Sequence, residues 1–334
     1  MENNIKNNTS YICLVSLFFI GNAVINLPFK ENSLGSIPGF LIAFFVSLPL
    51  NFLFSKMSFE PKKTPFGITA TIIFTVYALF CGIVTLRNYV TFSDRIILPE
   101  IGSFFPTLVF LLLLWLICRE KETVLLKLSL ISAVAVFFCV VLLFLLSLDD
   151  MSIKEIIPKR MPTLKEIGYQ SLAYFAMSFV EGIVLVCFLK GESKKALTSG
   201  FLFGSALIFL TLIQAVALFG YNSLSQLNNP YSSAISTLTF GDKFSRMEGF
   251  SYLLYFSCTL TKTAVCIKTG RTALCTLFPN IKKYFIPAVL LIYGIMCVFT
   301  NIFINIGFLK IAPYLIVPAL ILILLFKINR SSIR

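Results

Sequence analysis

Long apolar segments, most of them near twenty residues, recur along the whole chain. Crossing the hydrocarbon core of a bilayer as an α-helix takes about twenty apolar residues, because each residue rises about 1.5 Å. A membrane β-barrel needs short alternating segments instead, and soluble domains rarely contain 57% hydrophobic residues. The sequence therefore predicts an all-α polytopic membrane protein, with residues 1–334 forming a single integral membrane domain.

Ten apolar segments are expected to span the membrane. Their approximate bounds are Tyr11–Leu27, Ile37–Phe54, Phe66–Val90, Phe104–Ile117, Leu125–Leu148, Gly168–Leu189, Leu197–Tyr221, Met247–Ile267, Phe285–Ile306 and Ile311–Phe326. Ten spans divide into two sets of five with opposite orientation, as inverted repeats require. We expect the first repeat at about 11–148 and the second at about 168–306, with spans nine and ten completing the bundle to 326. No residue-level identity accompanies the repeat, which rests on spacing alone.

Lys and Arg residues concentrate in alternate loops. With the N-terminus inside, the inside segments hold about twice as many of them as the outside loops. This bias predicts that both termini are cytoplasmic. It also explains the net charge of +13 without a nucleic-acid partner, and the basic inside loops are suited to contact anionic membrane lipids.

Residues for common enzyme chemistry are missing from the sequence. The chain has no His, no phosphate-binding Gly-x-x-x-x-Gly-Lys and no Gly-x-Ser-x-Gly, and its nine Cys are scattered. We therefore expect no enzyme activity, no catalytic residue, no metal site and no cofactor.

Glu181 is the only carboxylate deep inside a predicted span. A charge near the bilayer centre costs about 2.5–3.5 kcal/mol on insertion scales, so such residues usually line a cavity or a path. Gly182 follows directly and weakens the helix there. These features favour a binding or coupling role. The alternative is a structural Glu181, held protonated or paired with a Lys or Arg.

Span one carries a second polar interruption, with Gly21 and Asn22 near its middle and Pro28 at its outer end. In an inverted repeat, span one is the counterpart of span six, where Ser178 and Glu181 lie at matching depth. Corresponding interruptions in corresponding spans indicate a ligand site at the midplane. The alternative is a glycine packing contact, with Asn22 bonded to a neighbouring helix.

Span eight carries a polar stripe at helical spacing, formed by Glu248, Tyr252, Tyr255, Thr259 and Lys262. Such a face must point at the bundle interior or at water, so it lines a pathway or packs through hydrogen bonds. Arg87, late in span three, is expected to snorkel to the outer interface. Two outside connections are long, Asp149–Ile167 and Asn222–Arg246, and Tyr231–Phe240 within the second reads as a short surface helix.

Three segments carry a resemblance to a known family. They are Phe19–Pro28 with its Gly-Asn and terminal Leu-Pro, Phe175–Val184 with its Phe-Val-Glu-Gly, and Asn229–Glu248 with its Gly-Asp-Lys-Phe-Ser-Arg-Met-Glu. In these segments the chain resembles the spore germination permeases. Those proteins are the B subunits of Ger-type nutrient receptors, within the amino acid–polyamine–organocation transporter superfamily.

The resemblance implies a ten-helix LeuT-like bundle with helices one and six broken. It places the breaks at Gly21, Asn22, Ala23 and Val24 and at Ser178, Phe179, Glu181 and Gly182. Together with Tyr252 and Tyr255 on span eight, these are the candidate ligand-binding residues. Arg246 and Glu248 match the family's helix-eight motif, where a structural role and a ligand contact are equally expected. Asn22 departs from the family, which usually has a small or hydroxyl residue there.

The resulting functional expectation is a nutrient-germinant receptor subunit in the inner spore membrane. It would bind a small nutrient such as an amino acid within the membrane, and the resemblance implies an A subunit and a C lipoprotein as partners. One alternative is a secondary amino acid transporter of the same fold. A second is a structural or ion-conducting membrane subunit without a ligand.

Overall fold

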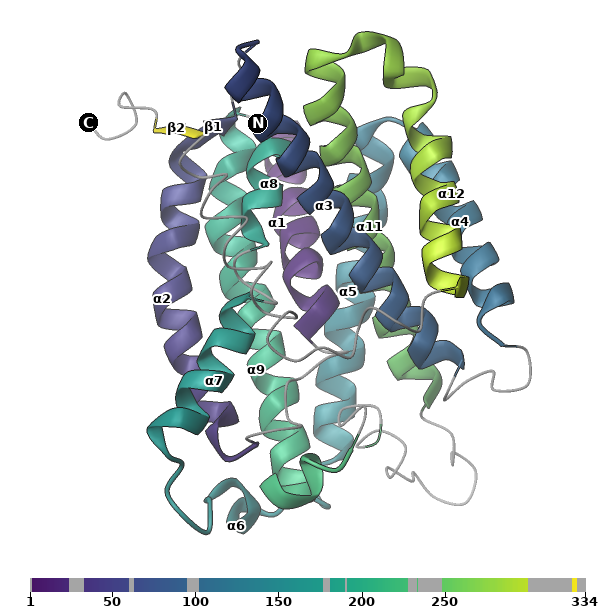
Figure 1. Cartoon of the computed structure of the whole chain (residues 1–334). Helices are drawn as coiled ribbons and strands as arrows, with labels where there is room; N and C mark the ends of the chain where they lie inside the picture. The colour runs from purple at the N-terminus through teal and green to yellow at the C-terminus, as the bar shows by residue number, and fades with distance from the viewer. Residues whose placement is uncertain are drawn as a thin grey trace.

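The computed structural model describes residues 2–23, 33–59, 63–94, 102–176, 181–189, 191–227, 233, 248–299 and 326–328. In these residues the chain is almost entirely helical, and its long helices run between two ends of one bundle (Figure 1). This confirms the predicted all-α fold class. The tenth predicted span falls almost wholly outside the described residues, so the count of ten stays a prediction.

The first five predicted spans each contain one long helix, and so do spans seven to nine. The helices are α1 (Glu2–Ala23), α2 (Ser36–Lys56) after a 3-10 turn η1 (Ser33–Gly35), α3 (Pro65–Phe92), α4 (Phe104–Arg119), α5 (Glu122–Leu146), α9 (Lys195–Leu224), α11 (Glu248–Leu277) and α12 (Phe285–Phe299). By length and composition α2, α3, α5 and α9 are able to cross a membrane, and α1, α4 and α12 contain shorter apolar stretches. Exposed apolar side chains such as Phe45, Ile131 and Leu291 cover the outer faces, as lipid contact requires.

Predicted span six is two helices rather than one. Its first half, α7 (Leu164–Tyr174), begins with a capping box in which Thr163 and Glu166 bond each other's backbone N–H groups. Its second half, α8 (Gly182–Phe188), begins directly after Glu181. The predicted break in helix six is therefore confirmed. Helix α1 ends at Ala23, inside predicted span one, and the residues from 24 to 32 lie outside the described part.

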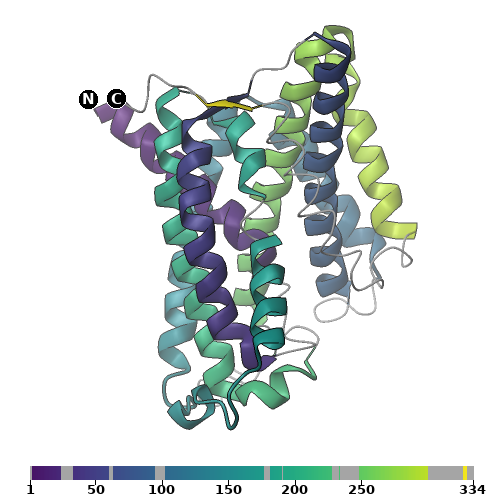
Figure 2. The same ribbon diagram turned by 60° about the vertical axis from the view of Figure 1, so that its left-hand side comes forward.

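The helices form two groups that meet along α11. One group contains α1, α2, α7 and α9, and the other contains α3, α4, α11 and α12, with α5 contacting α1, α9 and α11 (Figure 2). If each helix is replaced by its counterpart in the other repeat, the contact of α1 with α9 becomes the contact of α7 with α2. The same exchange converts the contact of α3 with α12 into that of α11 with α4. This is the relation that two inverted repeats of five spans produce. The bounds of the repeats stay a prediction.

Glycine pairs spaced by four residues make two of these related contacts. In the first repeat Gly35 and Gly39 face α7, where a Cβ on Gly39 would lie 2.6 Å from the Cβ of Gln170. In the second repeat Gly200 and Gly204 face α1, where a Cβ on Gly200 would lie 2.5 Å from the Cβ of Val15. Such small-residue pairs let helix backbones approach closely in membranes. They supply a residue-level correspondence between the halves that the sequence analysis missed.

A short β-ribbon stands at the end of the bundle that is predicted to be cytoplasmic. Strand β1 (Met57–Phe59) pairs antiparallel with β2 (Phe326–Ile328), with Met57 opposite Ile328. The Lys194 ammonium donates to the Met57 carbonyl at 2.5 Å, from the 3-10 turn η4 (Gly191–Lys194) that follows α8. The ribbon, which the sequence analysis did not anticipate, therefore connects the end of α8 to the chain's last segment.

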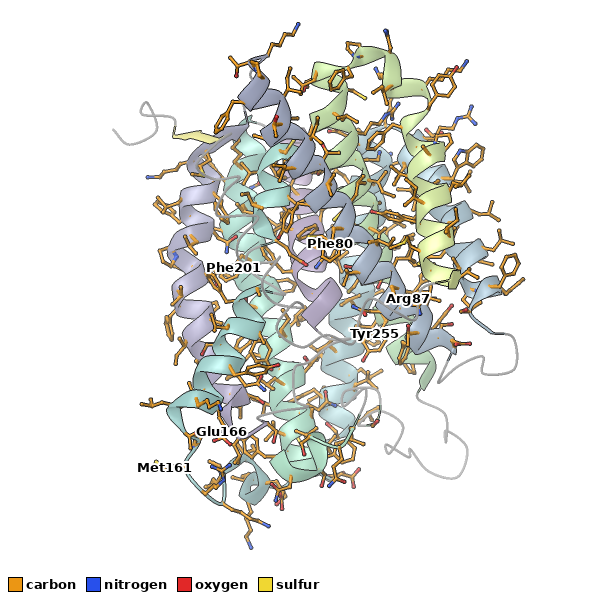
Figure 3. The ribbon with its side chains drawn as sticks, in the orientation of Figure 1. Phe80, Arg87, Met161, Glu166, Phe201 and Tyr255 are labelled. Carbon is orange, nitrogen blue, oxygen red and sulfur yellow. The ribbon has the colours of Figure 1, made fainter. Side chains whose placement is uncertain are left out.

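Arg87 joins α3 to α12. Its side chain is partly buried and donates to the backbone carbonyl of Cys297, in the last turn of α12 (Figure 3). Carbonyls in the last turn of a helix lack partners within it, so a cation stabilises them. Arg87 therefore has a packing role between the two helices, and the expectation that it snorkels to the outer interface stays a prediction.

Candidate ligand site at the helix break

The centre of the bundle contains one ion pair. Lys262, halfway along α11, donates to the carboxylate of Glu181, the residue before α8. Both side chains are 0% exposed. The described residues contain one further ion pair, at the surface, between Arg160 and Glu166. Of the two ion pairs in the described residues, this one therefore has both of its charged side chains completely buried.

This pairing follows from the cost of burying charge. Taking two charges out of water costs several kcal/mol for each ion, and only close mutual contact with further favourable contacts offsets it. The Lys262 ammonium also lies 5.1 Å from the centroid of the Phe18 ring on α1, close enough for a cation–π contact. The pairing that the sequence left open as the alternative for Glu181 is thus present.

Two glycines bring four helices together around the pair. A Cβ on Gly21 of α1 would lie 3.0 Å from the Cδ of Lys262. A Cβ on Gly182 of α8 would lie 2.9 Å from the Oδ1 of Asn51 on α2. Larger residues at either position would push into the space that these side chains fill. The glycine packing contact expected as the alternative for Gly21 is therefore also present.

Buried polar atoms without a hydrogen-bond partner lie on the helices that form the site. The Nδ2 of Asn51 donates to the Ser47 carbonyl at 2.9 Å, but its Oδ1, next to Gly182, has no partner. One turn from Lys262, the hydroxyl of Thr259 is also without one. Buried polar groups are nearly always hydrogen-bonded, so these atoms are suited to bind a polar ligand or water.

The candidate residues on α11 divide between two places. Lys262 reaches the ion pair, whereas Tyr252 and Tyr255 pack against α3 nearer the predicted outer end (Figure 3). The hydroxyl of Tyr89 donates to that of Tyr252 at 2.6 Å, and the ring of Tyr255 lies 4.5 Å from that of Phe92. These contacts match the packing alternative for the outer part of the polar stripe. A ligand role for the two tyrosines stays a prediction.

Several candidate residues lie outside the described part of the chain. They are Val24, Ser178, Phe179 and Arg246, and the side chains of Asn22, Ala23 and Glu248. The surface helix expected at Tyr231–Phe240 also lies there, apart from Ser233. Among the candidate residues, the structure brings Gly21, Glu181 and Gly182 together.

Sequence reasoning left Lys262 and Asn51 out of the candidate ligand site. Lys262 was assigned to the polar stripe, although it is a lone cation at mid-span just as Glu181 is a lone carboxylate. Two opposite charges at the same depth are expected to pair, which is a signal that the sequence contains. Asn51 lies within an apolar span, and its amide was the corresponding signal.

The described residues provide few side chains that are placed to bind a metal ion. They contain no group of three or more His, Cys, Asp or Glu side chains placed to hold one, and all nine cysteines are free. The chemistry that this site offers is the recognition of charge and hydrogen-bonding groups: one carboxylate, one ammonium, and unpartnered amide and hydroxyl oxygens.

Comparison with solved structures identifies the fold. The chain is similar to Mhp1, a nucleobase-cation-symport-1 family transporter solved in a closed conformation with bromovinylhydantoin bound. The TM-score is 0.50 at 12% sequence identity, over 95% of this chain and 74% of that one. This likeness confirms the predicted LeuT-like transporter fold of an integral membrane protein.

Comparison with protein families gives the relationship of the sequence itself. No curated protein matches the chain. A family model described as "spore germination protein" matches residues 52–309, which include the break in helix six, Lys262 and the whole of helices α7 and α9. The chain therefore belongs to the spore permease family of spore germination proteins.

Proposed function

We propose that the chain is the permease-like subunit of a nutrient-germinant receptor. It binds a small nutrient, such as an amino acid, within the inner spore membrane and triggers germination together with an A subunit and a C lipoprotein. Both termini lie in the cytoplasm. Family membership and the transporter fold support a receptor or transporter role. The observation that carries the ligand site is the buried Glu181–Lys262 pair at the break in helix six.

The pair defines the chemistry of a ligand that can replace it. Glu181 and Lys262 satisfy each other inside the protein, so a ligand that separates them must supply a partner for each. A zwitterion carries both partners. Its carboxylate accepts from Lys262, and its ammonium donates to Glu181 and to the Oδ1 of Asn51.

Separation of Glu181 from Lys262 would couple ligand binding to a conformational change. A ligand shifts a conformational equilibrium only when it binds one state more tightly, and a zwitterion between the two charges favours the separated arrangement. Helix α8 begins at Glu181 and contacts β1, and Lys194 just beyond its end bonds Met57. Movement of α8 would therefore reach the β-ribbon at the predicted cytoplasmic face, where a signal can leave the membrane.

A secondary amino acid transporter is the second candidate. The likeness to the fold of a transporter favours it, and the same separation of Glu181 from Lys262 would then accompany passage of the ligand. The two functions differ in net movement of the nutrient across the membrane, which separates them experimentally.

The test combines a germination assay with an uptake assay. Spores that lack the chain are complemented with the native protein, with Asn51→Leu, or with Ser55→Ala as a control on an exposed residue of α2. We expect Asn51→Leu to weaken the response to amino acids about tenfold, because it removes the unpartnered acceptor at the site. The control should respond normally.

Uptake of the same labelled amino acid is measured in proteoliposomes that contain either the native chain or Asn51→Leu. A germination response without net uptake supports the receptor, and net uptake that Asn51→Leu weakens supports the transporter. An unchanged response and unchanged uptake in Asn51→Leu, with native amounts of protein, would show that the ligand lies elsewhere.

A further inference from the structure

A cavity of about 540 Å3 opens at the end of the bundle opposite the β-ribbon. Its lining residues come from the connection that contains the short helix α6 (Ile153–Ile156), from the last turns of α9 and, with Leu34, from η1. Figure 1 shows α6 beside the end of α9. The charge bias of the loops predicts that this end faces outward. The volume lies in the range of small-molecule sites, which is about 300–1,000 Å3.

Hydrogen bonds between the two walls hold the cavity in shape. The backbone N–H of Ser152 donates to the Ala217 carbonyl at 3.0 Å, and the Tyr221 hydroxyl donates to the Ile156 carbonyl at 3.1 Å. Both ends of α6 are thereby attached to α9. The cavity is thus a built feature of two connected elements.

The cavity presents two unpaired charges of opposite sign. The Glu155 carboxylate lies against Gly220, in space that a Cβ on that residue would occupy. Within the described residues neither the Glu155 carboxylate nor the Lys159 ammonium has an ion-pair partner of opposite charge, since the two ion pairs there are Arg160–Glu166 and Glu181–Lys262. The third charged wall residue, Arg160, is already bound to Glu166 at 2.6 and 3.2 Å.

We propose that this cavity is a second small-molecule site, separate from the buried pair, and that it binds a zwitterionic amino acid. The ligand's ammonium pairs with Glu155 and its carboxylate with Lys159. Asn222 and Ser223 are available for hydrogen bonds, and Leu34 and Phe219 form an apolar wall for the ligand's side chain. A ligand with one charge would leave one of the two cavity charges without a partner, so the zwitterion is favoured.

The position of the cavity makes it accessible when the central site is closed. Its charges lie at the surface of the bundle and need no rearrangement before they meet a ligand, whereas Glu181 and Lys262 must first separate. An amino acid arriving from the predicted outer side would therefore meet Glu155 and Lys159 first. This inference stands on the cavity alone and does not depend on the function proposed for the central pair.

The test measures binding of L-leucine to the purified full chain in nanodiscs of neutral lipid, by isothermal titration calorimetry. Leucinamide lacks the carboxylate, and 4-methylpentanoate lacks the ammonium. The variants are Glu155→Gln, Lys159→Gln and the cavity-filling Ser223→Trp. Lys154→Gln is the matched control, because Lys154 is an exposed cation on the same short helix that does not line the cavity. Every variant is measured both in the native chain and in the neutral double variant Glu181→Gln/Lys262→Met.

In the double-variant background we expect leucine to bind, and both analogues to bind at least tenfold more weakly. Glu155→Gln and Lys159→Gln should weaken leucine binding at least tenfold, Ser223→Trp should abolish it, and Lys154→Gln should leave it unchanged. No leucine binding in that background, or equal binding by the cavity variants and the control, would overturn the proposal. Loss of binding only through Glu181 and Lys262 would overturn the cavity site while supporting the central one.

Discussion

The buried pair and the outer cavity each offer one carboxylate and one ammonium, yet they differ in every other respect. Glu181 and Lys262 are fully buried and bound to each other, whereas Glu155 and Lys159 lie near the surface without partners. The difference follows from solvent. Water solvates the outer charges, whereas the inner charges lie out of solvent and pair with each other.

This contrast separates two ways of binding the same kind of molecule. The outer charges can take a ligand as they stand, so binding there is expected to change the protein little. The inner charges can take a ligand only by parting, so binding there is coupled to a change of shape. A receptor that converts binding into a signal requires the second arrangement.

The largest expected effect comes from removing one member of the inner pair. Lys262→Met removes the cation that pairs with the buried Glu181 carboxylate, which should lower the free energy of unfolding by about 3–5 kcal/mol. Lys159→Met should change it by no more than about 0.5 kcal/mol, because Lys159 is exposed and its charge is already solvated. Thermal unfolding of both variants in detergent provides the comparison.

The double variant Glu181→Gln/Lys262→Met serves as the control for that experiment. Neutral replacements of a buried pair are often harmless, so the second change should recover most of the lost stability. If Lys262→Met and Lys159→Met unfold at the same temperature, the inner pair is not desolvated as described. The two sites then do not differ in the solvation of their charges.

A smaller effect is expected where α1 is held against the pair. Gly200→Ala would place a Cβ 2.5 Å from the Cβ of Val15 and 2.8 Å from the Ile12 carbonyl, so α1 must shift. Overpacking of this kind costs about 1–3 kcal/mol. Gly168→Ala is the matched control, because nothing lies within 4 Å of its added Cβ. That control should be neutral or stabilising by up to about 1 kcal/mol, and equal melting of the two variants would contradict the close α1–α9 contact.

A smaller difference between the two sites is expected in how they respond to ionic strength. Raising the ionic strength from 0.1 M to 1 M shortens the Debye length from about 10 Å to about 3 Å. Leucine binding at the outer cavity should weaken several-fold over this range, as measured by titration in the neutral double variant. The stability difference between the native chain and Lys262→Met should stay nearly constant, since the inner charges have no solvent between them. If leucine binding at the outer cavity does not depend on salt, Glu155 and Lys159 do not bind the ligand.

The smallest expected effect concerns pH at the start of α7, outside the membrane. The pKa of Glu166 is lowered below its ordinary value of 4.5, first by the backbone N–H of Thr163 and then by the Arg160 guanidinium. A lowered pKa in the folded state contributes stability above the unfolded pKa, and that contribution is lost as the pH falls through the folded value. Amide exchange in the first turn of α7 should therefore accelerate below about pH 4.5. In Glu166→Gln the acceleration should be absent, and its persistence would assign the effect to another group.

Much of this fold could be predicted from the sequence because lipid requires each spanning segment to be helical in its backbone and apolar in its side chains. Apolar segments near twenty residues located the helices, and Glu181 with Gly182 located the break in helix six. Helix α11 was among the ten apolar segments expected to span, at Met247–Ile267, although it is not among the described helices apolar enough to cross a membrane by composition. It lies at the centre, where neighbouring helices satisfy its polar groups.

What could not be predicted depends on partners that are distant in sequence. Lys262 and Glu181 are 81 residues apart, and only the packing of α11 against α8 brings them together. The glycine pairs were visible as spacings, but their meaning depends on which helix each one faces. The β-ribbon joins segments from opposite ends of the chain, each too short to carry a strand signal of its own.

The proposed function requires Glu181 and Lys262 to separate when a nutrient binds. The most direct test is the germination response of spores in which the chain has been replaced by Glu181→Gln/Lys262→Met. We predict that this variant reaches native amounts in the membrane and melts within a few degrees of the native chain, yet gives no response to amino acids at any concentration. A native response at native concentrations would contradict the claim and reduce the pair to a structural contact.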